Sequence, residues 1–405
     1  MSEKIKIHLL IISVTFLISN LSGQESPLQV GGYIKNLSAY QVGSFAGMPE
    51  KSGRFQNSLQ LRLNLDWYVL ANLSAALQSR HLFFYQKNIK NNTHFFNSSF
   101  TSRYYFDLET KPVNRKNFQA TSEIDRLYLD WSRKHMQITA GRQRIAWGTA
   151  LAWNPTDLFN PFNILDFDYE EKPGTDALYL QYYLGPLSQI DLAITPGKKA
   201  GQVIYALRYY FNFRDYDINL IAGWQRKSVR IGASWAGQIL DGGFRGELLY
   251  SKPHIRYNPG QFSSAPPPYP VPDKIIDRPY FTGVLSFDYT WENSFYIHTE
   301  YLYNGLGATK KAATRRLDVL VTGELSPARH SIFQEFAYNI TPLLRGNFFV
   351  IFNPTDLSWV AAPSLSYSLS DNWEVYFLAF PSTGRANTEF GDFPSWYFCR
   401  FRFFF

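Results

Sequence analysis

Segments of about ten residues in which apolar and polar side chains alternate recur along most of the chain. The clearest is 57–67, where every second residue from Leu59 to Trp67 is apolar and those between, from Gln60 to Asp66, are polar. Successive side chains of an extended strand point to opposite faces, so this pattern predicts a strand with one apolar and one polar face. The same alternation returns in 126–131, 189–194, 229–235, 285–289 and 373–377. Because no convincing amphipathic helix separates these segments, they predict an all-β protein.

The predicted strands number 18, with 16 as the alternative. They cover residues 28–41, 55–69, 71–85, 123–132, 134–143, 175–184, 187–196, 201–212, 214–224, 227–237, 241–251, 279–290, 293–303, 330–340, 343–353, 357–369, 372–381 and 394–405. Long connections follow only odd-numbered strands and comprise 42–54, 86–122, 144–174, 252–278, 304–329 and 382–393. Tight turns follow even-numbered strands and include 132–133, 291–293 and 370–372. An even-stranded barrel has long outer loops and short periplasmic turns, and both termini are then periplasmic.

The last predicted strand, 394–405, decides between a soluble and a membrane-spanning sheet. Every second residue from Tyr397 to Phe405 is apolar, whereas Arg400 and Arg402 point to the opposite face. A transmembrane β-strand has this pattern, with an apolar face for lipid and a polar face for a wet lumen. Since so apolar a strand would aggregate as an open edge, we expect it to pair with the first strand. This closes a single transmembrane antiparallel β-barrel; an edge strand of a soluble β-protein is the alternative.

The chain end also carries a resemblance. A terminal Phe405 after alternating aromatic residues resembles the C-terminal signature of Gram-negative outer-membrane proteins. The resemblance implies that the barrel-assembly machinery reads the last strand. It also implies outer-membrane lipid and lipopolysaccharide as surroundings, and we expect a monomer.

Composition and the N-terminus agree with this interpretation. Aromatic residues make up 18% of the 405 residues, and the mean hydropathy is −0.24. A barrel is only moderately apolar on average, because half of each strand faces the lumen. Lys4 and Lys6 before the apolar run 9–18 predict a signal peptide over 1–23, which leaves a barrel of 24–405 in the outer membrane of a Gram-negative cell. The net charge of +7 is spread along the chain, so no nucleic-acid partner is predicted.

One predicted outer loop, 144–174, differs from the others because it is apolar, aromatic and rich in turn formers. Its large apolar residues, among them Trp147 and Trp153, cannot all face water without forming an exposed patch. An outer loop that stays with the barrel cannot reach lipid, so we expect these residues to be buried in the lumen. A loop folded inward would form the constriction of the pore.

Residues 141–177 carry a second resemblance. They contain Gly-Arg-Gln, Trp-Gly, Asn-Pro-Thr-Asp and Glu-Glu-Lys-Pro-Gly-Thr-Asp-Ala in that order. This succession looks like a group of porin-like outer-membrane barrels in the style of the alginate-export family, whose members have 18 strands. The resemblance implies a channel for passive diffusion or export of small or oligomeric polar solutes, and it names no substrate. Asn-Pro-Thr-Asp-Leu occurs at 154–158 and again at 353–357, so turn formation alone can explain that part of the motif.

The candidate residues for the pore are charged or aromatic. The guanidinium groups of Arg142 and Arg144 either grip anionic solutes or pin the loop to acids such as Asp157. The constriction and pore-lining candidates are Arg142, Arg144, Trp147, Trp153, Asp157, Arg126, Asp130, Arg62, Arg208 and Arg230. Arginines and acids are nearly balanced on the predicted lumen face. This suits internal ion pairs or neutral polar solutes better than a polyanion path.

The sequence gives no support to catalysis. It contains no His-x-x-x-His spacing, nucleophile elbow or phosphate-binding loop, and a lone His298 beside Glu300 is typical of a hydrogen-bonded histidine. We predict no enzyme activity, no cofactor and no metal. A structural or adhesive barrel without transport is the alternative function, and an outer-membrane hydrolase is a further one.

Overall fold

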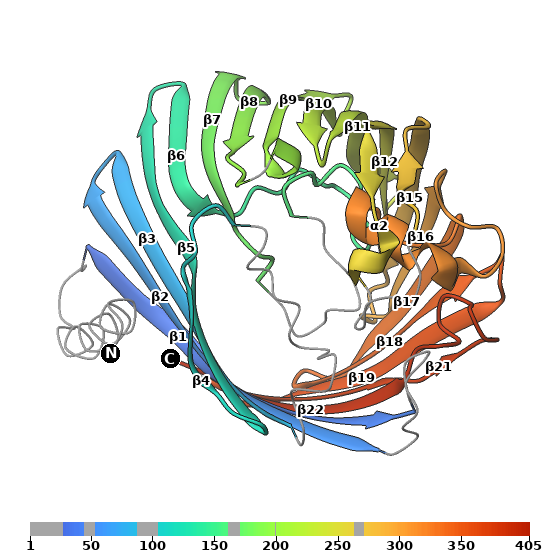
Figure 1. Cartoon of the computed structure of the whole chain (residues 1–405). Coiled ribbons are helices and arrows are strands. Elements are labelled where there is room, and N and C mark those ends of the chain that lie inside the picture. Colours follow the sequence, from blue (N-terminus) through green and yellow to red (C-terminus); the bar gives the residue numbers. More distant parts are fainter. Residues whose placement is uncertain (1–26, 44–52, 87–103, 161–170, 199, 263–270) are drawn as a thin grey trace.

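The computed structural model describes residues 27–43, 53–86, 104–160, 171–198, 200–262 and 271–405. The predicted signal peptide lies outside these residues. Eighteen antiparallel strands form a closed barrel, which Figure 1 shows as a ring. The barrel strands are β1 (Leu28–Val42), β2 (Arg54–Leu70), β3 (Leu73–Gln86), β5 (Phe118–Arg133), β6 (Met136–Gln143), β7 (Thr175–Gly185), β8 (Ser188–Thr195), β9 (Ile204–Phe213), β10 (Tyr216–Gln225), β11 (Ser228–Ile239), β12 (Gly242–Pro253), β15 (Tyr280–Thr290), β16 (Tyr296–Asn304), β17 (His330–Thr341), β18 (Leu344–Asn353), β19 (Ser358–Ser370), β20 (Trp373–Phe380) and β22 (Ser395–Phe404).

Short elements lie in the connections. They are β4 (Glu109–Asn114), β13 (Ile255–Tyr257), β14 (Lys274–Ile276), β21 (Ser382–Thr383), the 3-10 helices η3 (Ala200–Gln202), η4 (Pro259–Phe262) and η5 (Ala312–Arg315), and the helix α2 (Arg316–Thr322). No helix in the described part of the chain is long and apolar enough to cross a membrane.

The first and last strands close the ring. β1 pairs with β2 on one side and with β22 on the other, so that Leu37 lies opposite Arg400. Beyond the ladder, the Gly32 and Phe405 backbones exchange hydrogen bonds of 3.0 and 3.1 Å. Closure leaves the sheet of 18 barrel strands without an open edge between β1 and β22, and it confirms the predicted fold class and the count of 18.

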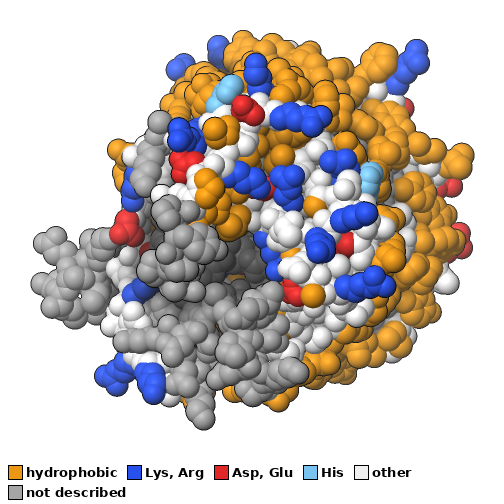
Figure 2. All heavy atoms as spheres, turned by 45° about the vertical axis from the view of Figure 1, so that its right-hand side comes forward, with side chains coloured by type: hydrophobic (Ala, Val, Ile, Leu, Met, Phe, Trp, Pro, Cys, Tyr) orange, Lys and Arg blue, Asp and Glu red, His pale blue; other side chains and the backbone are white. Residues whose placement is uncertain are grey.

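The alternating residues of the strands point in turn to the outside and to the inside of the barrel. Outward side chains such as Leu129 and Phe213 are more than half exposed, at 56% and 57%, whereas the inward Arg62 and Glu247 are buried. Figure 2 shows hydrophobic side chains over the outer wall. An apolar outer wall around a polar interior is the arrangement of a transmembrane barrel.

The connections follow the predicted parity, with one correction. Two residues join β2 to β3 and β5 to β6 at one end, whereas the long connections lie at the other, here called the loop end. The predicted loop 86–122 is partly strand: β5 starts at Phe118 instead of residue 123, because its pairing with β3 continues to Tyr85, and β4 pairs with β5. The rest of that loop, 87–103, lies outside the described residues.

Candidate functional site

Residues 145–160, in the connection between β6 and β7, run through the inside of the barrel and are held there by carboxylates of the wall. Glu247 on β12 accepts five hydrogen bonds from this segment, of which the Thr149 hydroxyl gives the longest, at 3.4 Å, and the other four are shorter. The donors of these four are the backbone N–H groups of Thr149 (2.6 Å), Ala150 (2.9 Å) and Thr156 (2.9 Å) and the Thr156 hydroxyl (2.7 Å). A buried carboxylate that takes up otherwise unpaired backbone donors makes strong, charge-assisted hydrogen bonds. Glu247 therefore fixes the path of the segment along the inside of the wall.

Glu300 on β16 holds the next part of the segment, residues 151–153, in the same way. It accepts the backbone N–H groups of Leu151 (3.2 Å), Ala152 (3.1 Å) and Trp153 (2.6 Å). His298 supports Glu300, because its Nε2 lies 3.2 Å from the Glu300 carboxylate.

The described part of the chain holds no group of His, Cys, Asp and Glu side chains arranged to bind a metal ion.

Two apolar clusters hold the same segment. Trp147 packs edge-to-face against Phe159, with ring centroids 5.2 Å apart. This first cluster packs against inward residues of β7, β8, β9, β10 and β12, namely Ala177, Ala193, Ala206, Ile221 and Leu249. In the second cluster Trp153 packs against Phe333 of β17, with centroids 6.2 Å apart. Trp147, Trp153, Leu158 and Phe159 are thus buried between the segment and the wall, as predicted; residues 161–170 of the predicted loop lie outside the described residues.

A second connection, 305–329, also attaches to the inner wall, and Figure 1 shows its helix α2 within the ring of strands. Glu324 accepts hydrogen bonds from the Tyr280 and Thr282 hydroxyls of β15, each 2.7 Å long. Arg230 of β11 donates to Glu324 (3.1 Å) and to the Thr322 carbonyl oxygen (2.7 Å). Sequence reasoning treated this connection as a plain outer loop, because its polar residues carry no signal for burial.

Most of the predicted pore arginines are engaged in the wall. Arg142 pairs with Asp176 at 2.8 Å and lies over the Tyr104 ring, 3.9 Å from its centroid. Arg62 pairs with Asp125 at 2.8 Å. Asp125 was not predicted to face inward. It is the extra residue of a β-bulge opposite Gln78 and Ser79, which turns it and its neighbour to the same side.

The remaining wall candidates have local partners too. Arg126 donates to the backbone carbonyl oxygens of Asp125 and Lys172. Arg208 donates to Asp191 at 2.6 Å, and Asp130 accepts hydrogen bonds from Gln137 (2.8 Å) and Thr139 (2.6 Å). These contacts correspond to the internal ion-pair alternative of the sequence analysis.

Unlike the other charged candidates, Arg144 and Asp157 form no hydrogen bond or ion pair with the described residues of the wall. Arg144 is exposed, and its side chain has no hydrogen bond or ion pair among the described residues. Asp157 is 2% exposed, and neither carboxylate oxygen accepts a side-chain hydrogen bond from the part of the chain that is described, although the Trp147 backbone N–H lies near enough to lower its pKa. Burial raises the pKa of Asp157 to about 7, and the Glu247 charge acts in the same direction, against Lys172 and Arg144. Asp157 can therefore change charge near neutral pH.

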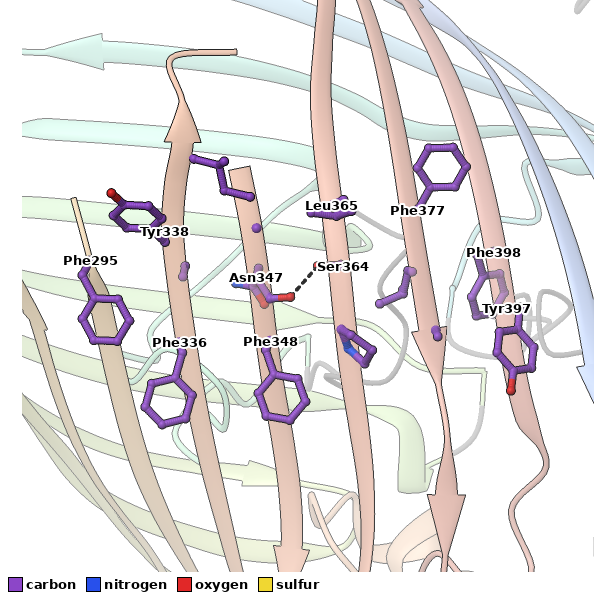
Figure 3. Close-up of a pocket in the computed structure, with 16 residues that line it drawn as sticks. Phe295, Phe336, Tyr338, Asn347, Phe348, Ser364, Leu365, Phe377, Tyr397 and Phe398 are labelled. Atoms are coloured by element: carbon purple, nitrogen blue, oxygen red, sulfur yellow. Dashed lines mark hydrogen bonds between the residues drawn. The ribbon is translucent and has the colours of Figure 1, made fainter. Parts of the chain in front are cut away.

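A pocket of about 730 Å³ does not belong to this interior site. Its lining includes Phe348, Phe377 and Tyr397, which are 41–50% exposed on the outward face of β18, β20 and β22. Figure 3 shows these rings beside the strands of the wall. The pocket is a hollow in the lipid-facing surface.

Comparison with solved structures identifies the fold. No family model and no curated protein sequence matches this chain. The structure of OccAB4 from Acinetobacter baumannii matches with a TM-score of 0.56 and 9% identity, over 95% of this chain and 100% of that one. OprD from Pseudomonas aeruginosa matches at 0.55 with 6% identity over 95% of each chain. OpdK from Pseudomonas aeruginosa with vanillate matches at 0.51 with 8% identity, over 93% and 98%.

At these identities the likeness concerns the fold. The chain has the 18-stranded barrel fold of outer-membrane porins. The porin-like part of the predicted resemblance is thereby supported, whereas the comparisons give no support to its alginate-export part.

Proposed function

We propose that the protein is an outer-membrane channel for passive diffusion of small polar solutes, narrowed by residues 145–160. The observation that carries the proposal is the attachment of this segment to the inside of the wall by Glu247 and Glu300. A closed barrel of 18 strands is wide enough to need such a segment to restrict its lumen. The apolar outer wall and the porin fold support the outer membrane as the location.

Small solutes fit this interior better than long polyanions do. Arg62, Arg142 and Arg230 are 1–2% exposed and paired with wall or loop carboxylates, so they form no continuous row of free cations. Arg144 is exposed and directly precedes residues 145–160, here called the inward segment. Export of an oligomeric solute, the finer part of the family resemblance, rests on the motif in 141–177 alone.

Liposome swelling tests this function. Liposomes that contain the purified protein should take up small sugars and vanillate faster than protein-free liposomes do. Vanillate is the solute in the OpdK structure. Swelling rates should fall with solute size, since the pore is narrowed. A folded barrel that leaves swelling at the protein-free rate for every small solute would overturn the proposal and favour the structural or adhesive alternative.

A further inference from the structure

A pocket of about 530 Å³ lies at the loop end, between the residues that lead from β14 into β15 and the end of β16. Four cationic side chains, Lys274, Arg278, Arg315 and Arg329, line it against one acid, Asp277. Figure 2 shows lysine and arginine side chains gathered at one end of the barrel, beside the hydrophobic wall. The pocket thus has an excess of positive charge at the border of the apolar surface.

The other side of the pocket is aromatic and faces outward. Phe281 near the start of β15 and Tyr303 near the end of β16 line it and are 50% and 37% exposed. The His330 ring lies 5.6 Å from that of Tyr303, and its Nδ1 is 2.6 Å from the Tyr301 hydroxyl. Aromatic side chains in a band at the end of the strands mark the membrane–water interface of a barrel. The pocket therefore lies at the depth of lipid headgroups.

Asp318 holds two of the four cations, Lys274 and Arg315, in place. The buried Asp318 of α2 lies 2.7 Å from the Lys274 ammonium and 2.8 Å from the Arg315 guanidinium. Burial alone would raise the pKa of Asp318, but hydrogen bonds from Lys274, Tyr257 and Arg315 outweigh it, and the pKa lies below its ordinary value. One carboxylate thus orients two cations and leaves one positive charge uncompensated.

The other two cations have no such partner. Neither Arg278 nor Arg329 has a side-chain hydrogen bond or ion pair within the described ranges, and the Arg329 Nε atom is buried without an acceptor. A buried donor that lacks an acceptor is unfavourable. A phosphate group offers acceptors that match a guanidinium in bidentate geometry.

We propose that this pocket binds the phosphorylated headgroup of an outer-leaflet lipid. Arg278 and Arg329 hold the phosphate, and Phe281 and Tyr303 contact the first part of the acyl chains. The lipid is favoured over a free phosphate ester because the aromatic half of the pocket lies on the outward wall, where an apolar chain is available. The inference requires the loop end to face outward, but it does not require the barrel to conduct.

Lipid binding by reconstituted protein tests the proposal. The wild type, R278A/R329A and the control K252A/K310A, which removes two exposed lysines outside the pocket, are placed in phosphatidylcholine nanodiscs. The probes are bis-phosphorylated lipid A, the same lipid without phosphates, and inorganic phosphate. Bound probe is measured by native mass spectrometry. We expect the wild type and the control to bind lipid A about tenfold more tightly than R278A/R329A does.

Each other outcome contradicts part of the proposal. Equal lipid A binding by the wild type and R278A/R329A would overturn the site, as would equal binding of phosphorylated and dephosphorylated lipid. If inorganic phosphate binds as tightly as lipid A, the pocket does not select a lipid, and the proposed ligand is wrong. If heat-modifiable mobility shows that the double variant is unfolded, R278A, which changes only an exposed residue, is expected to show a partial loss. Conductance of the same variants in planar bilayers should not differ from that of the wild type, which separates this test from that of the channel.

Discussion

The replacement of Glu247 by Gln tests how the inward segment is held. One oxygen of this carboxylate accepts the Thr149 and Ala150 N–H groups, and the other accepts the Thr156 N–H and hydroxyl. A glutamine amide keeps one acceptor oxygen and turns an NH₂ group toward the other pair of donors. Hydrogen bonds to a charged group are worth about 1.5–3 kcal/mol each, so the loss of two weakens attachment by about 3 kcal/mol. This is roughly a hundredfold in the ratio of attached to detached segment.

Single-channel recording in planar bilayers measures the effect. E247Q, and more strongly E247Q/E300Q, should show more current noise and more frequent excursions to higher conductance. The control is E374Q, because Glu374 pairs with Arg400 and Arg402 on the wall and does not contact the segment. If the double variant folds and its current traces match those of the wild type and E374Q, the two glutamates do not hold the segment in place.

Three further predictions concern single residues. Arg144→Glu should shift ion selectivity towards cations, seen as a changed reversal potential in a salt gradient; an unchanged potential would remove Arg144 from the solute path. Because burial raises the pKa of Asp157 from 3.8 to about 7, the neutral acid stabilises the attached segment, and this stabilisation is lost as the pH rises from about 4 to about 7; current noise should increase over that range and level off above it. Asp157→Asn is neutral at every pH and should keep the quiet trace, whereas an equal pH response would contradict the assignment. Deletion of Phe405, or Phe401→Asp, which costs up to about 2 kcal/mol on the lipid face, should lower the amount of heat-resistant barrel on gels; normal amounts would argue against the assembly signature.

The strands could be predicted because their signal is local. Alternation along β2 or β22 depends only on which of two faces meets lipid, and loop-length parity then checks the count. The inward position of Asp125 could not be predicted, because a bulge in β5 shifts the alternation by one residue. No pattern within a strand announces a bulge of this kind.

The docking of the inward segment had a signal that the sequence analysis did not use. Phe333, Val360 and Phe398 occupy inward positions of β17, β19 and β22 and are apolar, although a wet lumen calls for polar residues. Apolar residues on both faces of neighbouring strands indicate that something packs inside the barrel. The partners themselves, Glu247 and Glu300, are about 100 and 150 residues away from the backbone groups they bind, and only the structure pairs them.

The measurement that tests the channel with its constriction most directly is single-channel conductance of the wild type beside a variant that lacks residues 146–165. The wild type should conduct in discrete steps, and the variant should conduct in larger steps, because the lumen loses the segment that Glu247 and Glu300 hold against the inside of its wall. A folded wild type that never conducts would contradict the channel. A folded variant with steps of wild-type size would show that residues 145–160 do not narrow the path.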